Sequence, residues 1–185
     1  MKKAAVSLLG LMLVMFVLSA CNKDDSTPAP TPTLTLYDSL GGTTMVQDPN
    51  NTSVMIEQGR LGIRSVVDST IFVIAADTAI NSYFTVLLSE VGAGNLTGFQ
   101  LLSNNLTDFF CVATGAKNFT YSGLSMTNAH NPATNPRIND KVANDDFDAF
   151  ITDLVKGAQQ NALPDYLITR VGQVTETTRS EIVQK

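Results

Sequence analysis

The single histidine of the chain, His130, is the side chain best suited to bind a metal or to transfer a proton near neutral pH. Zinc sites, catalytic triads and histidine-based acid/base sites need a histidine with suitable partners, and one histidine excludes most sites built from several. The stretch GLSMTNAH, followed by NPATNP, predicts a short helical turn that carries Met126 and His130 on one face and ends at Pro132. A lone histidine is more often structural or exposed than a ligand, so both interpretations stay open on this pattern alone.

The first twenty residues have the pattern of an export signal. Two lysines precede an apolar run that ends at Leu18, and two small residues then precede Cys21. The segment LSAC resembles the lipobox of bacterial lipoproteins, which implies cleavage after residue 20 and acylation of Cys21. Several acyl chains would anchor the protein to a membrane outside the cytoplasm. The alternative is a signal peptide without lipid, and CNKDD also resembles a tag that routes some lipoproteins to the cell surface.

Charge and cysteine usage exclude several classes of function. The 12 basic and 17 acidic residues give a net charge of -5, and removal of the two lysines of the signal lowers it to -7. Nucleic acid is therefore not expected as a partner. With Cys21 acylated, Cys111 has no disulfide partner, and its place in the apolar run FFCVA predicts a buried, inert thiol. The glycines of VGAGNLTGF follow no strand and precede no GKS or GKT, so we predict a turn between helices and not a phosphate loop.

The elements that must position His130 are expected to be helices. Residues 21–34 form a tether rich in proline and threonine, and residues 35–185 have the length of one domain. A helix is predicted from Met55 to Ala76, with an apolar face made of Ile63, Val66, Val67, Ile71 and Ile74. A second helix is predicted to begin after Asn95 as its N-cap and to end at Thr114 and Gly115. Its apolar positions are Leu96, Phe99, Leu102, Leu106, Phe109 and Phe110.

Two further helices follow the histidine. Asn144 is predicted to cap the third, in which Asp145 and Asp146 face the positive helix end. Pro164 starts a fourth, predicted to run to near residue 182. The inward positions are Phe147, Phe150, Ile151, Leu154 and Val155 in the third helix, and Leu167, Val171, Val174 and Ile182 in the fourth. Alternating apolar and polar residues are scarce, so the predicted class is all-α.

Several stretches resemble group I truncated haemoglobins. LYDSLGG, residues 36–42, is similar to the opening of that family, and SVVDSTIFVIAADTAINSYF, residues 65–84, is similar to its B and C helices. TDFFCVATGAKNFTYSGLSMTNAH, residues 107–130, resembles the run from the E helix through a Y-x-G turn to the M-x-x-x-H of the F helix. DDFDAFITDLVKGAQQNALPDYLITRVGQ resembles the G and H helices. The resemblance covers nearly the whole domain and implies a truncated globin-like helical sandwich.

The resemblance implies one b-type haem per chain with His130 as the proximal iron ligand. The second ring nitrogen of His130 would donate to a nearby carbonyl, and Met126 would pack under the ring without serving as the opposite axial ligand. Phe84 corresponds to the aromatic side chain that stacks on the haem. The other apolar positions that the resemblance brings to the haem are Leu102, Leu106, Phe109 and Phe110 on the E helix, Ile138 and Phe147 on the proximal side, and Ile71 on the B helix.

The sequence departs from the family pattern at two places. The segment between Gly42 and Arg64, residues 43–63, is longer than the corresponding segment of the family. The B-helix tyrosine is replaced by Ile71, or by Phe72 if the register slips by one, and the E-helix glutamine by Leu106. An apolar distal side gives a bound gas no hydrogen-bond donor, so we expect weak retention of oxygen and a relatively better fit to carbon monoxide. Asn105 is the nearest polar side chain.

Three hypotheses follow. The first is a haem-binding globin of the cell envelope that binds a diatomic gas, either O2, CO or NO, and is held to the membrane through Cys21. The second is an enzyme on the same iron, a nitric oxide dioxygenase or peroxidase, which would need a redox partner that the sequence does not identify. The third is a surface interaction module that has lost haem.

Overall fold

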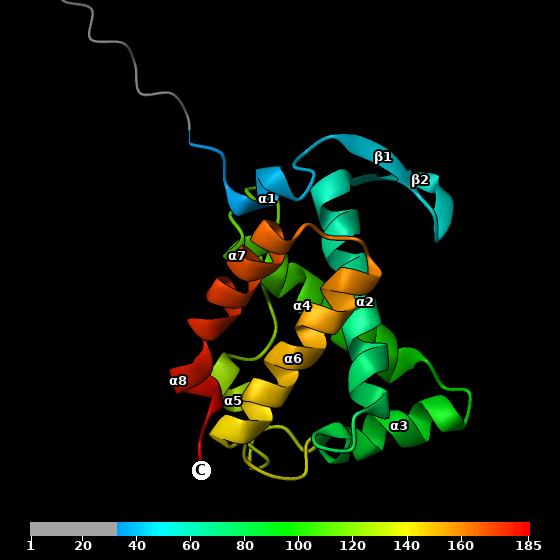
Figure 1. Cartoon of the computed structure of the whole chain (residues 1–185). Helices are drawn as coiled ribbons and strands as arrows, with labels where there is room; N and C mark the ends of the chain where they lie inside the picture. The colour runs from blue at the N-terminus through cyan, green and yellow to red at the C-terminus, as the bar shows by residue number, and fades with distance from the viewer. Residues whose placement is uncertain (1–32) are drawn as a thin grey trace, which may run out of the picture. The chain divides into compact units, whose positions relative to one another are not determined.

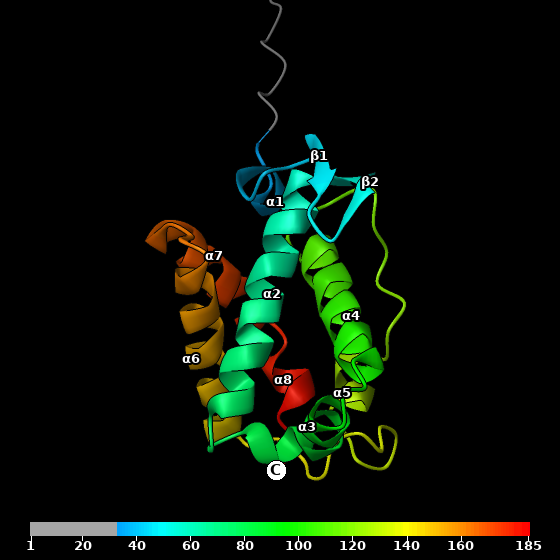
Figure 2. The same cartoon turned by 90° about the vertical axis from the view of Figure 1, so that its right-hand side faces the viewer.

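Helix α2 (Gln58–Ala76) runs through the middle of the part of the chain that the computed structural model describes, residues 33–185 (Figure 1). The predicted apolar face is confirmed, because five side chains on it are buried: Ile63, Val66, Val67, Ile71 and Ile74. In Figure 2, α2 lies between α4 (Thr97–Ala113) and α6 (Asn144–Gln160), the helices against which it packs most extensively. Cys21 and the predicted signal segment lie outside the described residues.

A β-hairpin precedes α2, which the all-α prediction does not include. Its strands β1 (Met45–Asp48) and β2 (Asn51–Glu57) pair in antiparallel fashion. Met55 therefore lies on β2, and the helix predicted from roughly Met55 begins three residues later, at Gln58.

The hairpin has little buried surface of its own. Ile56 and Asp48 are its buried side chains, so the alternation that identifies a strand in a sequence is short. Two hydrogen bonds of 2.7 and 2.9 Å join the Asp48 carboxylate to the guanidinium of Arg64 on α2. This ion pair holds the hairpin, which lies within the long segment of residues 43–63, against α2.

The other elements are short or lie at the edges of the bundle. They are α1 (Leu36–Ser39), η1 (Asn81–Phe84), α3 (Thr85–Gly92), α5 (Met126–Ala129), α7 (Asp165–Glu176) and α8 (Arg179–Ile182). Residues 93–96 connect α3 to α4, so VGAGNLTGF is the predicted turn between helices. Within residues 33–185 no single helix is long and apolar enough to cross a membrane, whereas Gln58–Ala76 and Asn81–Gly92 meet that test together as a pair bent by 107°.

The start of two helices differs from prediction by one residue. Asn95 stands before the N-cap of α4, and its side-chain oxygen accepts a hydrogen bond of 3.1 Å from the N–H of Thr97. The N-cap of α6 is Ala143, whose N–H donates to the Asp146 carboxylate at 2.8 Å, so Asn144 is the first helical residue. In both cases a nearby side chain satisfies the free N–H groups of the first turn.

The predicted fourth helix is broken into α7 and α8. The hydroxyl of Thr177 donates to the carbonyl of Val174, and the hydroxyl of Thr178 donates to that of Thr175, both at 2.7 Å. Such side-chain bonds compete with the backbone hydrogen bonds of a helix. The chain turns here, and α8 approaches α5.

The apolar side chains form two clusters. The larger cluster joins α2 to α1, α4, α6 and α7. The smaller cluster consists of Val142, Phe147 and Ile182, with Met126 and Tyr83 packed against it. The turn that carries His130 therefore belongs to the smaller cluster.

Candidate functional site

His130 directly follows α5, the short turn predicted from the sequence. Its Nδ1 lies 2.8 Å from the carbonyl oxygen of Met126, the neighbouring carbonyl that the second ring nitrogen was expected to meet. Nε2 makes no hydrogen bond to any residue between 33 and 185. Burial lowers the pKa of His130, against the opposing effect of the Met126 carbonyl, so the imidazole is neutral at pH 7. A neutral imidazole whose Nδ1–H is bound to a carbonyl presents the Nε2 lone pair to a metal.

The chain around His130 packs on the core through half-buried side chains, among them Ala116, Phe119 and Met126, and has no fully buried one. From Gly115 to Lys141, no described residue is buried, whereas Thr114 and Val142 on either side are. We refer to residues 115–141 as the histidine segment. An ordered segment without a buried side chain leaves its apolar surface open to a further partner.

Helix α4 has two faces that differ in burial. The face toward α2 is buried and carries Ser103, Thr107, Phe110 and Cys111. The neighbouring face, with Leu102, Leu106 and Phe109, is only half-buried. Cys111 is the buried thiol that was predicted, and burial raises its pKa to about 11.

The half-buried face of α4 contacts the histidine segment through an aromatic pair. The rings of Phe109 and Tyr121 lie edge to face, with centroids 5.9 Å apart. The Tyr121 hydroxyl donates to the carbonyl of Leu124 at 2.6 Å, just before α5. Tyr121 was not predicted as a contact, although the Y-x-G turn that contains it is part of the family resemblance.

Phe110 belongs to the buried face of α4. It lines a cavity of about 230 Å³ between α2, α4, α6 and α7, together with Val66, Leu154 and Val171. Its ring also lies edge to face against that of Phe109, with centroids 5.2 Å apart, so Phe110 joins the buried face to the half-buried one. His130 is not among the residues that line this cavity.

The other residues predicted to contact a haem lie in three parts of the structure. Phe84 and Ile71 join the larger cluster with Leu102, Leu106 and Phe109, whereas Met126 and Phe147 join the smaller one. Ile138 is half-buried in the loop after α5 and belongs to neither cluster.

The register of α2 favours Ile71 over Phe72 as the inward residue. Ile71 is 6% exposed, whereas Phe72 is 63% exposed and lies against the ring of Phe99 at 5.4 Å. Asn105 is half-buried, and its side chain makes no hydrogen bond within the described part of the chain. The side chains on the α2 and α4 faces named for the distal side are therefore apolar apart from Asn105.

The residues that are present fit a haem. A single imidazole with a free Nε2 is a common protein ligand of haem iron. The half-buried faces of α4 and the histidine segment supply apolar side chains that the protein covers only in part.

Comparison with known proteins bears on the fold. No protein-family model matches the chain, and no curated protein matches it significantly. Among solved structures, the ferric form of a truncated haemoglobin from Tetrahymena pyriformis matches with a TM-score of 0.56 and 22% identity, over 82% of this chain and all of that chain. A single-residue mutant of the same protein, also ferric, matches with a TM-score of 0.58 and 23% identity over the same shares. The chain therefore has the fold of the truncated haemoglobins.

Proposed function

We propose that this protein binds one b-type haem through His130 and holds a diatomic gas, either O2, CO or NO, at the iron. The observation that carries the proposal is the geometry of His130, with Nδ1 at the Met126 carbonyl and Nε2 without a hydrogen-bond partner among residues 33–185. The partly covered apolar surface of α4 and of the histidine segment supports it, as does the likeness in fold to ferric truncated haemoglobins.

The side chains have separable roles in this proposal. His130 binds the metal, and the Met126 carbonyl fixes its tautomer and makes Nε2 more basic. Phe84, Leu102 and Leu106 contribute apolar contact and exclude water. Haem, when bound, supplies an iron centre with one open position for a gas.

The distal side favours a gas that needs no hydrogen bond. Ile71, Leu102 and Leu106 carry no donor, and a polar ligand such as oxygen gains from one in a low-dielectric pocket. We expect fast release of oxygen and comparatively slow release of carbon monoxide. Slow oxygen release, measured by stopped flow on the haem-loaded protein, would refute this part of the proposal.

An absorbance titration with haem tests the proposal. The wild type should develop a Soret band at one haem per chain, and His130→Gly should lose it. Imidazole added to His130→Gly should restore the band, which separates loss of the ligand from loss of the fold. A protein that takes up no haem, or a His130→Gly variant with an unchanged spectrum, contradicts the proposal; the former result would favour an interaction module. Consumption of nitric oxide or peroxide with an added reductant would identify the enzymatic alternative.

We further propose that the protein is anchored in the cell envelope by lipid on Cys21. The support is the sequence LSAC after an apolar run, in residues that lie outside the described part of the chain. Mass spectrometry of the mature N-terminus should find an acylated cysteine in the membrane fraction. Cys21→Ser should abolish acylation, whereas Cys111→Ser, which changes the buried cysteine, should retain it.

A further inference from the structure

The last residues of the chain, 179–185, contact the turn that carries His130. We refer to them as the C-terminal clasp. Helix α7 ends where the hydroxyls of Thr177 and Thr178 donate to carbonyls of its last turn. Helix α8 therefore runs in a different direction from α7, and it lies beside α5 (Figure 1). The clasp is thus a consequence of the break in the predicted fourth helix.

Helix α5 cannot hold its own position. It has four residues and none of them is buried, and a single turn is unstable in isolation. The clasp supplies contacts from outside it: the side-chain amide of Gln184 donates to the carbonyl of Thr127 at 2.8 Å. Ile182 and Met126 share the smaller apolar cluster. The Met126 carbonyl fixes the His130 tautomer, and the clasp contacts the side chain of Met126 itself and the backbone of the next residue, Thr127.

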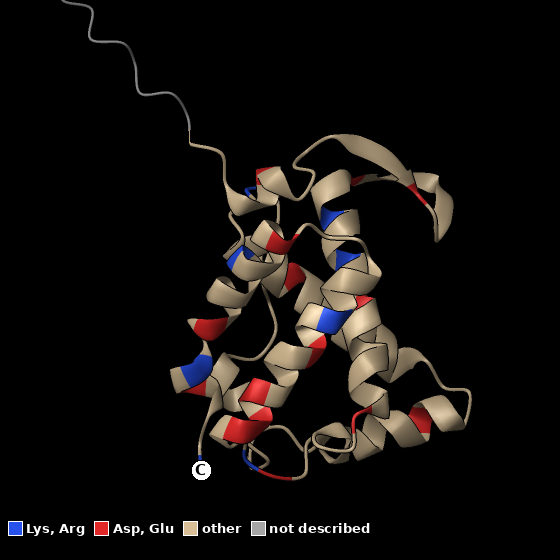
Figure 3. Ribbon diagram, viewed as in Figure 1, with Lys and Arg blue, Asp and Glu red and all other residues tan. Residues whose placement is uncertain are grey.

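The clasp is itself fixed to the rest of the bundle near its start. The guanidinium of Arg179 lies 4.3 Å from the ring centroid of Phe147 and forms an ion pair of 2.6 Å with Asp148. Asp and Glu residues gather at this end of α6, so a cation is well placed there (Figure 3).

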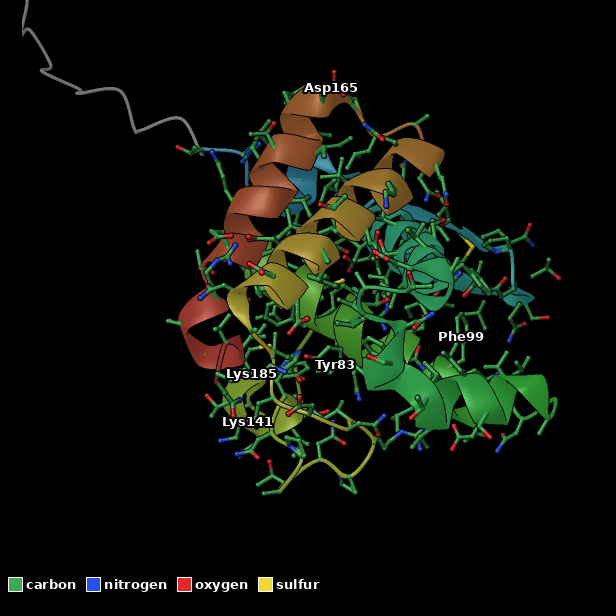
Figure 4. The ribbon with its side chains drawn as sticks, turned by 60° about the horizontal axis from the view of Figure 1, so that its bottom comes forward. Tyr83, Phe99, Lys141, Asp165 and Lys185 are labelled. Carbon is green, nitrogen blue, oxygen red and sulfur yellow. The ribbon has the colours of Figure 1, made fainter. Side chains whose placement is uncertain are left out.

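The middle and end of the clasp are fixed as well. Val183 forms a parallel bridge with Val142, and the N–H of Gln184 donates to the Val142 carbonyl at 2.9 Å. The ammonium of Lys185 donates to the Tyr83 hydroxyl at 3.2 Å and to Asp140 at 2.7 Å, and Figure 4 shows Lys185 beside Tyr83. Tyr83 directly precedes Phe84, so the clasp connects the proximal turn to the residue expected to stack on the haem.

We infer that the C-terminal clasp is a positioning element that sets the place of α5, and through it the direction of His130 Nε2. Within the clasp, Gln184 is the residue whose side chain bonds to the backbone of α5, and Thr134 and Asn135 of the histidine segment bond to the same turn at Asn128 and Ala129. The inference deepens the proposed function and rests on it for the role of His130 as a ligand.

The test compares Gln184→Ala with Gln173→Ala, a change at an exposed glutamine on α7 that makes no hydrogen bond within residues 33–185. In the haem-free protein, Gln184→Ala should speed hydrogen exchange of the amides of Ala129 and His130 by about fivefold, the scale of one neutral hydrogen bond. Gln173→Ala should leave these rates unchanged. In the ferrous haem-loaded protein, Gln184→Ala should shift the iron–histidine stretching frequency in resonance Raman spectra, whereas Gln173→Ala should not.

The outcomes separate the two proposals. Unchanged exchange at α5 and an unchanged iron–histidine frequency in Gln184→Ala overturn the clasp while leaving haem binding intact. If the protein takes up no haem, the proposed function fails, and the exchange rates alone decide whether the clasp positions α5. A Gln184→Glu variant, which keeps the length of the side chain but removes the donor, should behave as Gln184→Ala.

Discussion

Two regions of this chain are held in place by different means: the core of α2, α4, α6 and α7, and the histidine segment, residues 115–141. The core buries apolar side chains and pairs most of its polar ones internally, as where the Ser103 hydroxyl donates to Asp68, although the Thr107 hydroxyl and one Asp153 carboxylate oxygen have no partner within residues 33–185. The histidine segment has no fully buried side chain and depends in part on side-chain bonds to backbone carbonyls, such as that from the Asn135 amide to Ala129 at 2.7 Å. Water competes for such exposed bonds far better than for buried ones.

The difference indicates that the core folds independently of a ligand, whereas the order of the histidine segment depends on one. The core contains most of the buried apolar area and can form without a ligand. The histidine segment gains buried area only when something covers its inner surface. A ligand at His130 should therefore order this segment and leave the core almost unchanged.

Haem binding should give the largest change, and it should be confined to one region. At a free haem concentration about 100 times the dissociation constant, mass action stabilises the bound form by about 2.7 kcal/mol, or about 100-fold in exchange rate. We expect this protection for amides of residues 115–141, whose opening would release the haem, and little change for amides of α2 and α6 that exchange through local openings that keep the haem bound. Hydrogen exchange with mass spectrometry measures it. Equal protection of both regions, or a histidine segment already as protected as α2 without haem, would break the comparison.

A substitution in the core should do the reverse. A Cβ on Gly157 would lie 2.8 Å from the backbone nitrogen of Thr70 and clash with its hydroxyl, so α2 and α6 would have to move apart. Gly157→Ala should lower the free energy of unfolding by about 2 kcal/mol. Gly172→Ala on α7, where a Cβ meets nothing within 4 Å, should leave it unchanged or raise it by less than about 1 kcal/mol. Urea denaturation followed by circular dichroism distinguishes these results, and equal effects of the two variants would contradict the close contact.

A change within the histidine segment should have a smaller, local effect. The guanidinium of Arg137 forms hydrogen bonds of 2.6 and 3.0 Å with Glu90 on α3 and holds the pKa of that carboxyl below its usual value. The pair is partly exposed, so Arg137→Gln should cost less than about 1 kcal/mol. Exchange of residues 131–141 should rise by about threefold, and that of α2 should not change. An equal rise in α2 would mean that the segment and the core unfold as one unit.

The parts of the fold that sequence could predict are those set by local periodicity. The buried faces of α2 and α4 follow from steps of three and four, and the turn at Met126 follows from Pro132 and the family motif. Phe110 is fully buried whereas its neighbour Phe109 is half-buried, a difference that two adjacent and equally apolar residues do not reveal in a sequence. The hairpin was missed because a strand with few buried residues has almost no periodic signal.

The remaining features depend on contacts between distant residues. Each threonine between α7 and α8 is compatible with a helix by itself, and the break depends on which hydroxyls bond backwards. The Gln184 to Thr127 bond joins residues 57 positions apart, and no local pattern indicates it. For the site, the sequence could therefore indicate the candidate ligand, His130, and the turn that carries it, but not the contacts of residues 179–185 with that turn.

The attachment of the hairpin to the core provides the smallest and most local test. The Arg64 guanidinium and the N–H of Asn50 lower the pKa of Asp48 from 3.8 to about 2. Because the folded-state pKa is the lower one, the carboxylate stabilises the hairpin above pH 4, and this contribution is lost as the pH falls toward 2. Arg64→Met should raise the Asp48 midpoint toward 3.8, so that the hairpin loosens at a higher pH than in the wild type. Nuclear magnetic resonance of the Asp48 carboxyl carbon and the Met55 methyl group reports both events. Identical midpoints in the two proteins would show that the ion pair does not hold the hairpin to α2.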